Sequence, residues 1–182
     1  MTRRAVVIIG PMGAGKTSIG RRAAKALHVP FFDTDIAVVR AHGPIPQIFA
    51  LQGEPRFREL EREAVREALT TEGIVAVGGG AVLHPQTRAD LAHHPVLLLT
   101  VEARTVAARI RGASRPLLQG DDALQAWQRV ADERSRLYAG LADATVDTSA
   151  GHFRDLVERV ATWAQQQWDA DEPPAAGQEG TE

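Results

Sequence analysis

Residues 10–17 have the composition and spacing of a loop that binds nucleotide phosphates. They read Gly-Pro-Met-Gly-Ala-Gly-Lys-Thr and match the pattern G-x-x-x-x-G-K-[ST], between an apolar run and a helical pattern. The glycines let successive backbone N–H groups face the phosphates, and the positive end of the following helix adds to the attraction. Lys16 would supply a point charge to the β- and γ-phosphates, and the Thr17 hydroxyl is placed to ligate Mg²⁺. We therefore expect ATP to be bound by Gly13, Ala14, Gly15, Lys16, Thr17 and Ser18.

Two carboxylates, Asp33 and Asp35, follow a second apolar run at Phe31-Phe32. In an extended chain, residues two apart point to the same side, so both carboxylates are expected to face one site. One of them could reach Mg²⁺, directly or through water, and the other could accept the proton of a substrate hydroxyl. The alternative is an Asp pair that caps an exposed turn, but the neighbouring phosphate loop favours the catalytic interpretation.

Arg58 and Glu61 lie three residues apart on a helical pattern that runs from Glu54 to Thr70. In a functional interpretation, the planar guanidinium of Arg58 binds a substrate carboxylate through two hydrogen bonds and is oriented by Glu61. In the other interpretation, the two side chains form a solvated ion pair on a helix surface, which is the more common outcome at this spacing. The pattern alone predicts the solvated pair.

Three further features could contribute to the same site. Residues 78–80 are three glycines directly after an apolar run, which suits either the close approach of a ligand or a tight turn. Arg115 lies in residues 112–122, a segment with Gly, Ser and Pro that reads as a long surface loop and could be a lid carrying a cation. Arg134 and Tyr138, four apart on a helical pattern, could place another cation over the site, although their spacing does not decide this.

The elements that would position these residues alternate between short apolar strands and helical patterns. Strands are predicted at residues 5–9, 31–32, 74–77, 96–101 and 144–147. Continuous apolar runs are typical of strands buried on both faces, and parallel neighbours need helical crossovers. We therefore expect a three-layer α/β fold with a mainly parallel sheet, in which ligands bind at the carboxyl ends of the strands.

Composition limits the possible protein classes. The chain has 182 residues, of which 44% are hydrophobic and 24% charged, and this suits one globular domain. No apolar run approaches the roughly 18 residues of a membrane span, and no signal peptide is apparent, so we expect a cytoplasmic protein without a membrane partner. Because the chain has no cysteine, thiol nucleophiles, disulfides and Cys-ligated metal centres are excluded.

Charge is distributed unevenly along the chain. Residues 169–182 contain five acids and no Lys or Arg, so the net charge of −2 becomes +3 without them. We expect one domain over residues 1–168, followed by a disordered acidic tail. The basic residues form no Lys/Arg run, which argues against a nucleic-acid partner and favours small anions.

Together, these residues resemble the shikimate kinase family over residues 4–165. The resemblance implies a P-loop kinase fold of the nucleoside-monophosphate-kinase type, with a five-stranded parallel sheet and helices on both faces. It also implies a substrate subdomain around residues 33–61 and a closing lid around residues 112–123. The carrying motifs, in chain order, are the phosphate loop, Asp33-Thr34-Asp35, Ile48-Phe49, Gly53-Glu54, Phe57-Arg58-x-x-Glu61, the triple glycine, Arg115-Pro116-Leu117-Leu118 and Arg134-x-x-x-Tyr138.

The reaction implied by the resemblance is transfer of the γ-phosphoryl group of ATP to the 3-hydroxyl of shikimate, giving shikimate 3-phosphate and ADP. Arg58 and Arg134 would hold the shikimate carboxylate, Gly80 would add a backbone contact, and Asp35 would bind ring hydroxyls as the candidate base. Such a substrate explains the arginines and the carboxylate beside a phosphate loop, because they fix the acid at one end and present a hydroxyl to phosphorus at the other. Asp35 could mainly orient the hydroxyl, since a loose transition state needs little early proton transfer.

The resemblance also assigns residues to the nucleotide and its metal. Asp33 would be the water-mediated Mg²⁺ partner beside Thr17. Lys16 and the lid residue Arg115 would neutralise the transferring phosphoryl group, and Arg109 would contact the adenine side. The implied partners are shikimate and ATP, and we expect a monomer.

Two positions depart from the family pattern. Only Pro44 separates Gly43 from Ile45, and Pro46 follows, which should alter the start of a helix without removing a chemical group. Arg136 stands where a Pro is common in the family. The alternatives are another small-molecule kinase on this fold, for gluconate or a nucleoside monophosphate, and a non-catalytic nucleotide-binding regulatory module. Phe57-Arg58-x-x-Glu61 argues against the first, and the intact Lys16, Asp35 and Arg115 argue against the second.

Overall fold

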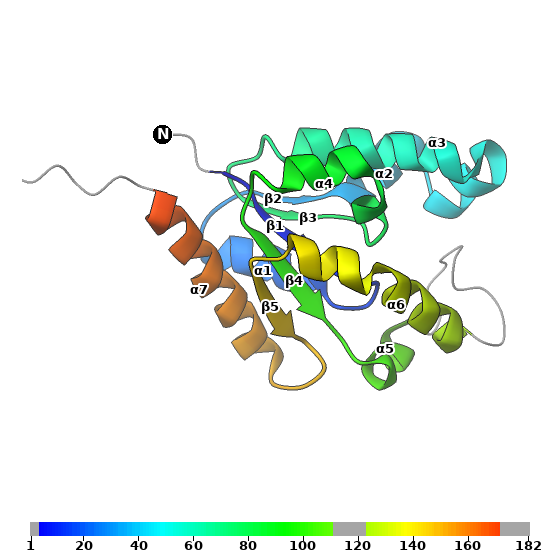
Figure 1. The fold of residues 1–182 in the computed structure, drawn as a ribbon. Helices are drawn as coiled ribbons and strands as arrows, with labels where there is room; N and C mark the ends of the chain where they lie inside the picture. The colour runs from blue at the N-terminus through cyan, green and yellow to red at the C-terminus, as the bar shows by residue number, and fades with distance from the viewer. Residues whose placement is uncertain (1–3, 111–122, 172–182) are drawn as a thin grey trace, which may run out of the picture.

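The predicted strands form one parallel sheet (Figure 1). The computed structural model describes residues 4–110 and 123–171, with side chains at all of these except 108–110. The sheet order is β2-β3-β1-β4-β5, and every neighbouring pair is parallel. Each strand lies where an apolar run predicted it, so the predicted α/β fold is confirmed. The strands are β1 (Val6–Ile9), β2 (Phe31–Asp33), β3 (Ile74–Ala76), β4 (Val96–Thr100) and β5 (Ala144–Asp147).

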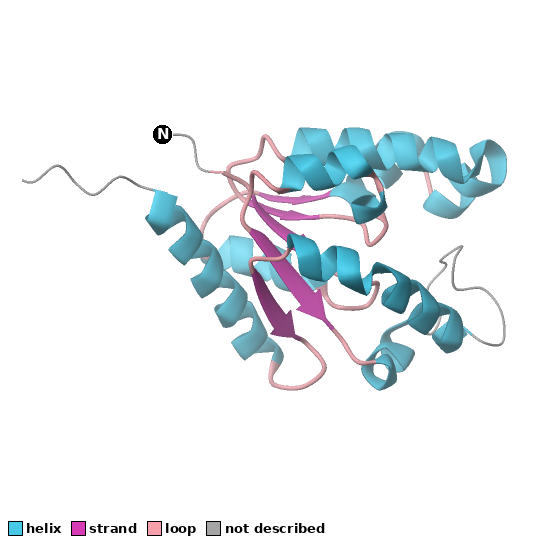
Figure 2. Cartoon of the chain, in the orientation of Figure 1, coloured by secondary structure: helices cyan, strands magenta, loops and turns pink. Residues whose placement is uncertain are grey.

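Helices connect the strands and cover both faces of the sheet (Figure 2). α1 and α7 pack against one face, whereas α3, α4 and η1 pack against the other. This arrangement confirms the three-layer prediction. The helices are α1 (Lys16–Ala26), α2 (Thr34–His42), α3 (Ile45–Ala68), the 3-10 helix η1 (Ala81–Leu83), α4 (Pro85–Leu91), α5 (Ala103–Ile110), α6 (Ala123–Leu141) and α7 (Phe153–Asp171).

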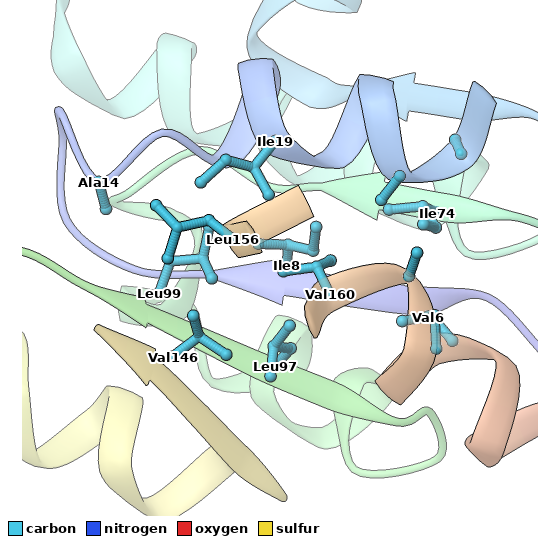
Figure 3. Packing of buried hydrophobic residues seen from close by; sticks show 14 of the residues in the cluster. Val6, Ile8, Ala14, Ile19, Ile74, Leu97, Leu99, Val146, Leu156 and Val160 are labelled. Atoms are coloured by element: carbon cyan, nitrogen blue, oxygen red, sulfur yellow. The ribbon is translucent and has the colours of Figure 1, made fainter. Parts of the chain in front are cut away.

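Burial on both faces explains the unbroken apolar sequence of β1. Because side chains alternate along a strand, Val6 and Ile8 join the cluster under α1 and α7, and Val7 and Ile9 join the cluster on the opposite face. In the first cluster, Ile8 lies among side chains of α1, β4 and α7 (Figure 3). The two clusters pack β1 on both faces, and this packing fixes the position at which the loop after Ile9 begins.

Helix α6 differs from the other helices because it contributes to both clusters. Trp127, near its start, is 3% exposed and packs with the side chains under α1 and α7. Tyr138, near its end, is equally buried and packs with the cluster on the opposite face. α6 therefore connects the two sides of the sheet, and it follows directly on the segment predicted as a lid.

Helix α3 begins earlier than the predicted helical pattern at Glu54. It starts at Ile45, with Pro44 as the N-cap residue and Pro46 in the first turn, as expected for an altered helix start. At Gly53 the backbone leaves helical geometry (φ 82°, ψ 167°), and Pro55 follows, so two helical segments meet there at a kink. The predicted helix thus corresponds to the second segment of α3, which carries Arg58 and Glu61.

The predicted boundary between the domain and the tail is wrong by three residues. Helix α7 continues through Asp171, so residues 169–171 are helical. Asp171 accepts hydrogen bonds of 2.8 and 2.5 Å from Arg4, and this ion pair ties the helix end to the residue before β1. The rest of the predicted tail, residues 172–182, lies outside the described residues, as does most of the predicted lid.

Within residues 4–110 and 123–171, no helix has both the length and the apolar character needed to cross a membrane.

Candidate active site

The phosphate loop predicted at residues 10–17 connects β1 to α1. Gly15 is the N-cap residue of α1 and has a left-handed backbone (φ 91°), which glycine adopts without steric cost. No side chain caps this helix, and its first turn contains no acid. The N-terminal N–H groups of α1 and its positive dipole end would therefore attract an anion.

Lys16 is held over the same loop. Its Nζ donates hydrogen bonds to the carbonyl oxygens of Gly10 (2.8 Å) and Pro11 (3.0 Å). These contacts fold the side chain back along the loop. The ammonium group therefore lies where the phosphate loop begins, which agrees with its predicted role as a charge on the ATP phosphates.

Thr17 and Asp33 are brought together at this edge of the sheet. The Thr17 hydroxyl donates to Asp33 Oδ2 at 2.6 Å, and Asp33 Oδ1 accepts from the Ile36 N–H at 3.0 Å, so the carboxylate also caps α2. Hydroxyl and carboxylate oxygens are the hard ligands that Mg²⁺ prefers, alongside water and substrate phosphates. The pair therefore fits the predicted magnesium site.

Asp35 takes a different orientation from the one predicted. Only Asp33 belongs to the strand, whereas Thr34 and Asp35 form the first turn of α2. The extended-chain argument is therefore wrong, because the Asp33 cap starts a helix at the next residue. Asp33 contacts Thr17, whereas the Asp35 carboxylate lies against Gly78 of the triple glycine. Its negative charge also raises the pKa of the Glu61 carboxyl. The two acids thus serve neighbouring parts of the site.

The triple glycine, residues 78–80, lies between the phosphate loop and a charged cluster. A Cβ on Gly78 would fall within 3.0 Å of Asp35 Oδ1 and Glu61 Oε1, and a Cβ on Gly80 would fall equally close to the Arg58 guanidinium. A Cβ on Gly79 would lie 3.5 Å from the Gly10 carbonyl oxygen. Residues 78–81 form a turn, closed by a hydrogen bond of 3.0 Å from the Ala81 N–H to the Gly78 carbonyl oxygen, but none of the three glycines has a left-handed backbone. Close approach of charged side chains therefore explains the lack of a side chain at Gly78 and Gly80, whereas a Cβ on Gly79 would make ordinary contacts.

Arg58 and Glu61 form a buried ion pair, which overturns the solvated pair that their spacing predicted. Arg58 donates from one terminal nitrogen to Glu61 Oε2 at 2.7 Å, and the side chains are only 18% and 4% exposed. Burial raises the pKa of the Glu61 carboxyl above its ordinary value. The positive charges of Arg58 and Arg134 lower this pKa, and the negative charge of Asp35 raises it further. Glu61 is therefore paired with Arg58 of the same helix, and the positive charge of Arg134 in α6 also acts on its carboxyl.

Arg134 and Tyr138 complete the cluster from α6. Both are buried, with 7% and 3% of their surfaces exposed. The Tyr138 hydroxyl donates to the Gly79 carbonyl oxygen at 2.5 Å, which ties α6 to the triple glycine. Burial raises the pKa of Tyr138, so the phenol remains protonated and a donor at neutral pH. The structure therefore places Arg134 inside the molecule, a point that the sequence left open.

Three buried groups that hold this site together were missed by sequence reasoning. The Thr34 hydroxyl accepts from the Gly78 N–H at 2.9 Å. Trp127 Nε1 donates to the Met12 carbonyl oxygen at 2.9 Å, and Thr148 Oγ1 lies 2.9 Å from the Ala14 carbonyl oxygen. A buried indole N–H usually needs a partner, which was a usable signal for Trp127. Nothing in the sequence marked the two threonines.

The other predicted site residues fall into two groups. Gly13, Ala14 and Ser18 lie in or just after the phosphate loop, as expected. Arg115 lies outside the described residues, and the side chain of Arg109 lies outside the described side chains. Their roles on the transferring phosphoryl group and on the adenine side therefore stay predictions.

Comparisons with known proteins point to one family. The family model described as "SKI: Shikimate kinase" matches residues 12–165. A shikimate kinase from Mycobacterium avium is 47% identical over 146 residues, which cover 79% of this chain and 83% of the relative. One from Thermobifida fusca is 42% identical over 179 residues, covering 97% of this chain and 98% of the relative. A structure of Acinetobacter baumannii shikimate kinase in complex with shikimate has a TM-score of 0.85 and 32% identity, and the match covers 91% of this chain and 95% of that one.

Proposed function

The chain belongs to the shikimate kinase family, and we propose from this premise which of its residues carry the transfer of the ATP γ-phosphoryl group to the 3-hydroxyl of shikimate. The products are shikimate 3-phosphate and ADP. The observation that carries the proposal is the buried ion pair of Arg58 with Glu61, which lies against Gly78 and Gly80, while Gly79 between them borders Gly10 of the phosphate loop. A site for an organic acid thus adjoins a site for phosphate.

Arg58 and Arg134 bind the shikimate carboxylate, and a backbone group of Gly80 adds a contact. A planar guanidinium suits a carboxylate because it donates two parallel hydrogen bonds. Glu61 fixes the orientation of Arg58 and keeps it charged in a buried setting, since it accepts from one terminal nitrogen at 2.7 Å. This fixation reduces the side-chain entropy that the arginine loses when the substrate binds.

Asp35 binds the ring hydroxyls and orients the 3-hydroxyl toward phosphorus. In support of this role, Asp35 lies in the first turn of α2 with its carboxylate against Gly78, beside the Glu61 carboxyl. The carboxylate accepts the hydroxyl proton either before or after the P–O bond forms. A loose transition state requires orientation more than early proton removal.

The phosphate loop and Lys16 hold the ATP phosphates, and Arg115 from the predicted lid neutralises the transferring group. Thr17 and Asp33, whose side chains meet at 2.6 Å, would hold Mg²⁺. When bound, the ion would supply positive charge against the phosphate oxygens. Arg109 contacts the adenine side. We also propose that the protein acts in the cytoplasm, where both of its small, water-soluble substrates would be available, and that it acts as a monomer.

Glu54 is expected to compete with the substrate for Arg58. Its Oε1 accepts from Arg58 Nη2 at 2.9 Å and from Nε at 3.2 Å, and Glu54 is half exposed. Shikimate must displace this carboxylate to reach the guanidinium. The Glu54→Gln variant should therefore lower the KM for shikimate about two- to fivefold, as expected for the loss of an exposed ion pair. Steady-state kinetics with varied shikimate at saturating ATP measures this.

Glu59→Gln is the matched control, because Glu59 forms an exposed pair with Arg56 on the same helix at 2.8 Å. Its KM for shikimate should stay unchanged. An unchanged or raised KM in Glu54→Gln would show that Glu54 does not occupy the substrate position.

The acceptor specificity of ADP release tests the proposed function. The purified protein is supplied with Mg²⁺ and ATP, and ADP is measured with shikimate, quinate, gluconate, a nucleoside monophosphate or no acceptor. The proposal predicts strong stimulation by shikimate alone. Stimulation by another acceptor would change the substrate, and nucleotide binding without acceptor-dependent release would indicate a regulatory module.

A further inference from the structure

The phosphate loop is anchored from behind by two side chains that come from distant parts of the chain. Trp127, in α6, donates from Nε1 to the Met12 carbonyl oxygen at 2.9 Å. Thr148, directly after β5, has its Oγ1 2.9 Å from the carbonyl oxygens of both Ala14 and Thr100, which share its one hydroxyl proton. Trp127 is 3% exposed and Thr148 is 2% exposed. Neither residue belongs to the loop motif, and neither has a role in the reaction as described above.

Peptide geometry shows what these contacts do. In a trans peptide unit, the carbonyl of one residue and the N–H of the next are coplanar and point in opposite directions, and the described backbone has no cis peptide bond. A partner that captures the Met12 carbonyl therefore aims the Gly13 N–H the other way. In the same manner, a partner of the Ala14 carbonyl aims the Gly15 N–H. Gly13 and Gly15 are among the residues predicted to bind the ATP phosphates.

These two peptide units need outside support. Gly13 and Gly15 both have left-handed backbones, with φ values of 79° and 91°, and glycine moves more freely between such conformations than any other residue. Packing holds the loop unevenly, because Ala14 is fully buried whereas Pro11 borders an open pocket of about 380 Å³ with Trp127 and Tyr138 in its wall. A directional hydrogen bond can hold the orientation of a peptide unit where packing does not.

We propose that Trp127 and Thr148 are positioning residues that hold the phosphate loop in the conformation that binds the nucleotide. The proposal rests on the proposed function only in taking this loop as the ATP phosphate site. Because α6 also carries Arg134, Trp127 joins the loop to the helix that completes the carboxylate cluster. Thr148 joins it to the end of β5, where its backbone N–H also bonds to Thr100 at 2.9 Å.

The test compares Trp127→Phe with Trp168→Phe. Trp168 is a matched control because it is 1% exposed and also donates its indole N–H to a backbone carbonyl, that of Arg4, at 2.8 Å. This contact lies just before the N-terminal end of β1, whereas the phosphate loop follows the C-terminal end of that strand. Both substitutions keep an aromatic ring and remove one buried hydrogen bond, so both should lower the melting temperature. Only Trp127→Phe should change nucleotide binding.

Calorimetric titration with ADP–Mg²⁺, without acceptor, gives the readout. Trp127→Phe and Thr148→Val should each raise the Kd between about three- and tenfold, and Thr148→Ser, which keeps the hydroxyl, should stay within twofold of the wild type. Trp168→Phe should leave this Kd unchanged. In turnover assays, the KM for ATP should rise in Trp127→Phe and Thr148→Val, while the KM for shikimate should not.

An unchanged Kd in either variant would overturn the proposal for that residue. An equal rise in Trp168→Phe would overturn it for Trp127, because the effect would then follow from general loss of stability. If Trp127→Phe does not fold, Thr148→Val against Thr148→Ser still tests the anchoring. Since the titration contains no acceptor, a failure of shikimate turnover would leave its outcome unaffected.

Discussion

Replacement of Asp35 by Asn is expected to lower kcat by about two to four orders of magnitude, the range typical for loss of a group that accepts or orients a reacting proton. Asn keeps the size of the side chain and loses the negative charge. The Kd for ATP–Mg²⁺ should stay within twofold, because Asp33 is the acid that contacts Thr17 beside the phosphate loop, whereas the Asp35 carboxylate lies against Gly78. Single-turnover measurement of ADP formation, with nucleotide binding measured separately, checks both expectations.

The negative charge of Asp35 raises the pKa of the buried Glu61 carboxyl, so the Asp35→Asn variant should lower that pKa. Thermal unfolding of the variant shows that it is folded before its turnover is compared with that of the wild type. Asp169→Asn, an exposed acid near the end of α7, is the control and should leave kcat unchanged. Near-normal turnover in Asp35→Asn would remove Asp35 from the mechanism.

Replacement of Arg58 by Ala is expected to raise the KM for shikimate about a hundredfold, the scale of losing one partner of a desolvated charged contact. The KM for ATP should stay within about twofold, since Arg58 lies beside Gly80 and Glu61 on the side of the site away from the phosphate loop. Initial rates over a matrix of both substrate concentrations separate the two constants. Equal rises in both would contradict the role of Arg58 as a carboxylate clamp.

Two controls separate binding from folding in this experiment. Arg56→Ala, on the same helix but in an exposed pair with Glu59, should leave both constants unchanged. Arg58→Ala leaves the buried Glu61 carboxylate without its closest partner, which costs stability. The double variant Arg58→Ala/Glu61→Gln removes this penalty, so it should regain stability while its KM for shikimate stays high. Recovery of a normal KM in the double variant would show that Arg58 only neutralises the buried Glu61 carboxylate and does not bind the substrate.

The fold was predictable because its signals are local. A strand that is buried on both faces must be largely apolar, and the apolar runs at Val6–Ile9 and Val96–Thr100 therefore predict buried strands. The phosphate loop was predictable for a related reason, since its glycines and its Lys-Thr pair lie within eight consecutive residues. The boundary errors at Glu54 and Asp169 arose where a helix continued beyond its clearest pattern.

The charged cluster was less predictable because its properties depend on distant residues. Arg58 and Glu61 have the spacing of a common surface pair, and only the approach of the triple glycine and α6 buries them. Asp35 was placed in an extended chain, although Asp33 already had the character of a helix cap. The contact between Trp127 and Met12 joins residues 115 positions apart, and no spacing rule reaches that far.

The position of phosphorylation tests the central claim most directly. The product formed from shikimate, ATP and Mg²⁺ is examined by two-dimensional ¹H–³¹P correlation NMR, with ADP measured in the same sample. The account predicts one phosphate ester for each ADP, with phosphorus coupled to the ring proton at carbon 3. Phosphorus coupled to another ring proton, or ADP accompanied only by inorganic phosphate, would contradict the arrangement proposed for Arg58, Arg134 and Asp35.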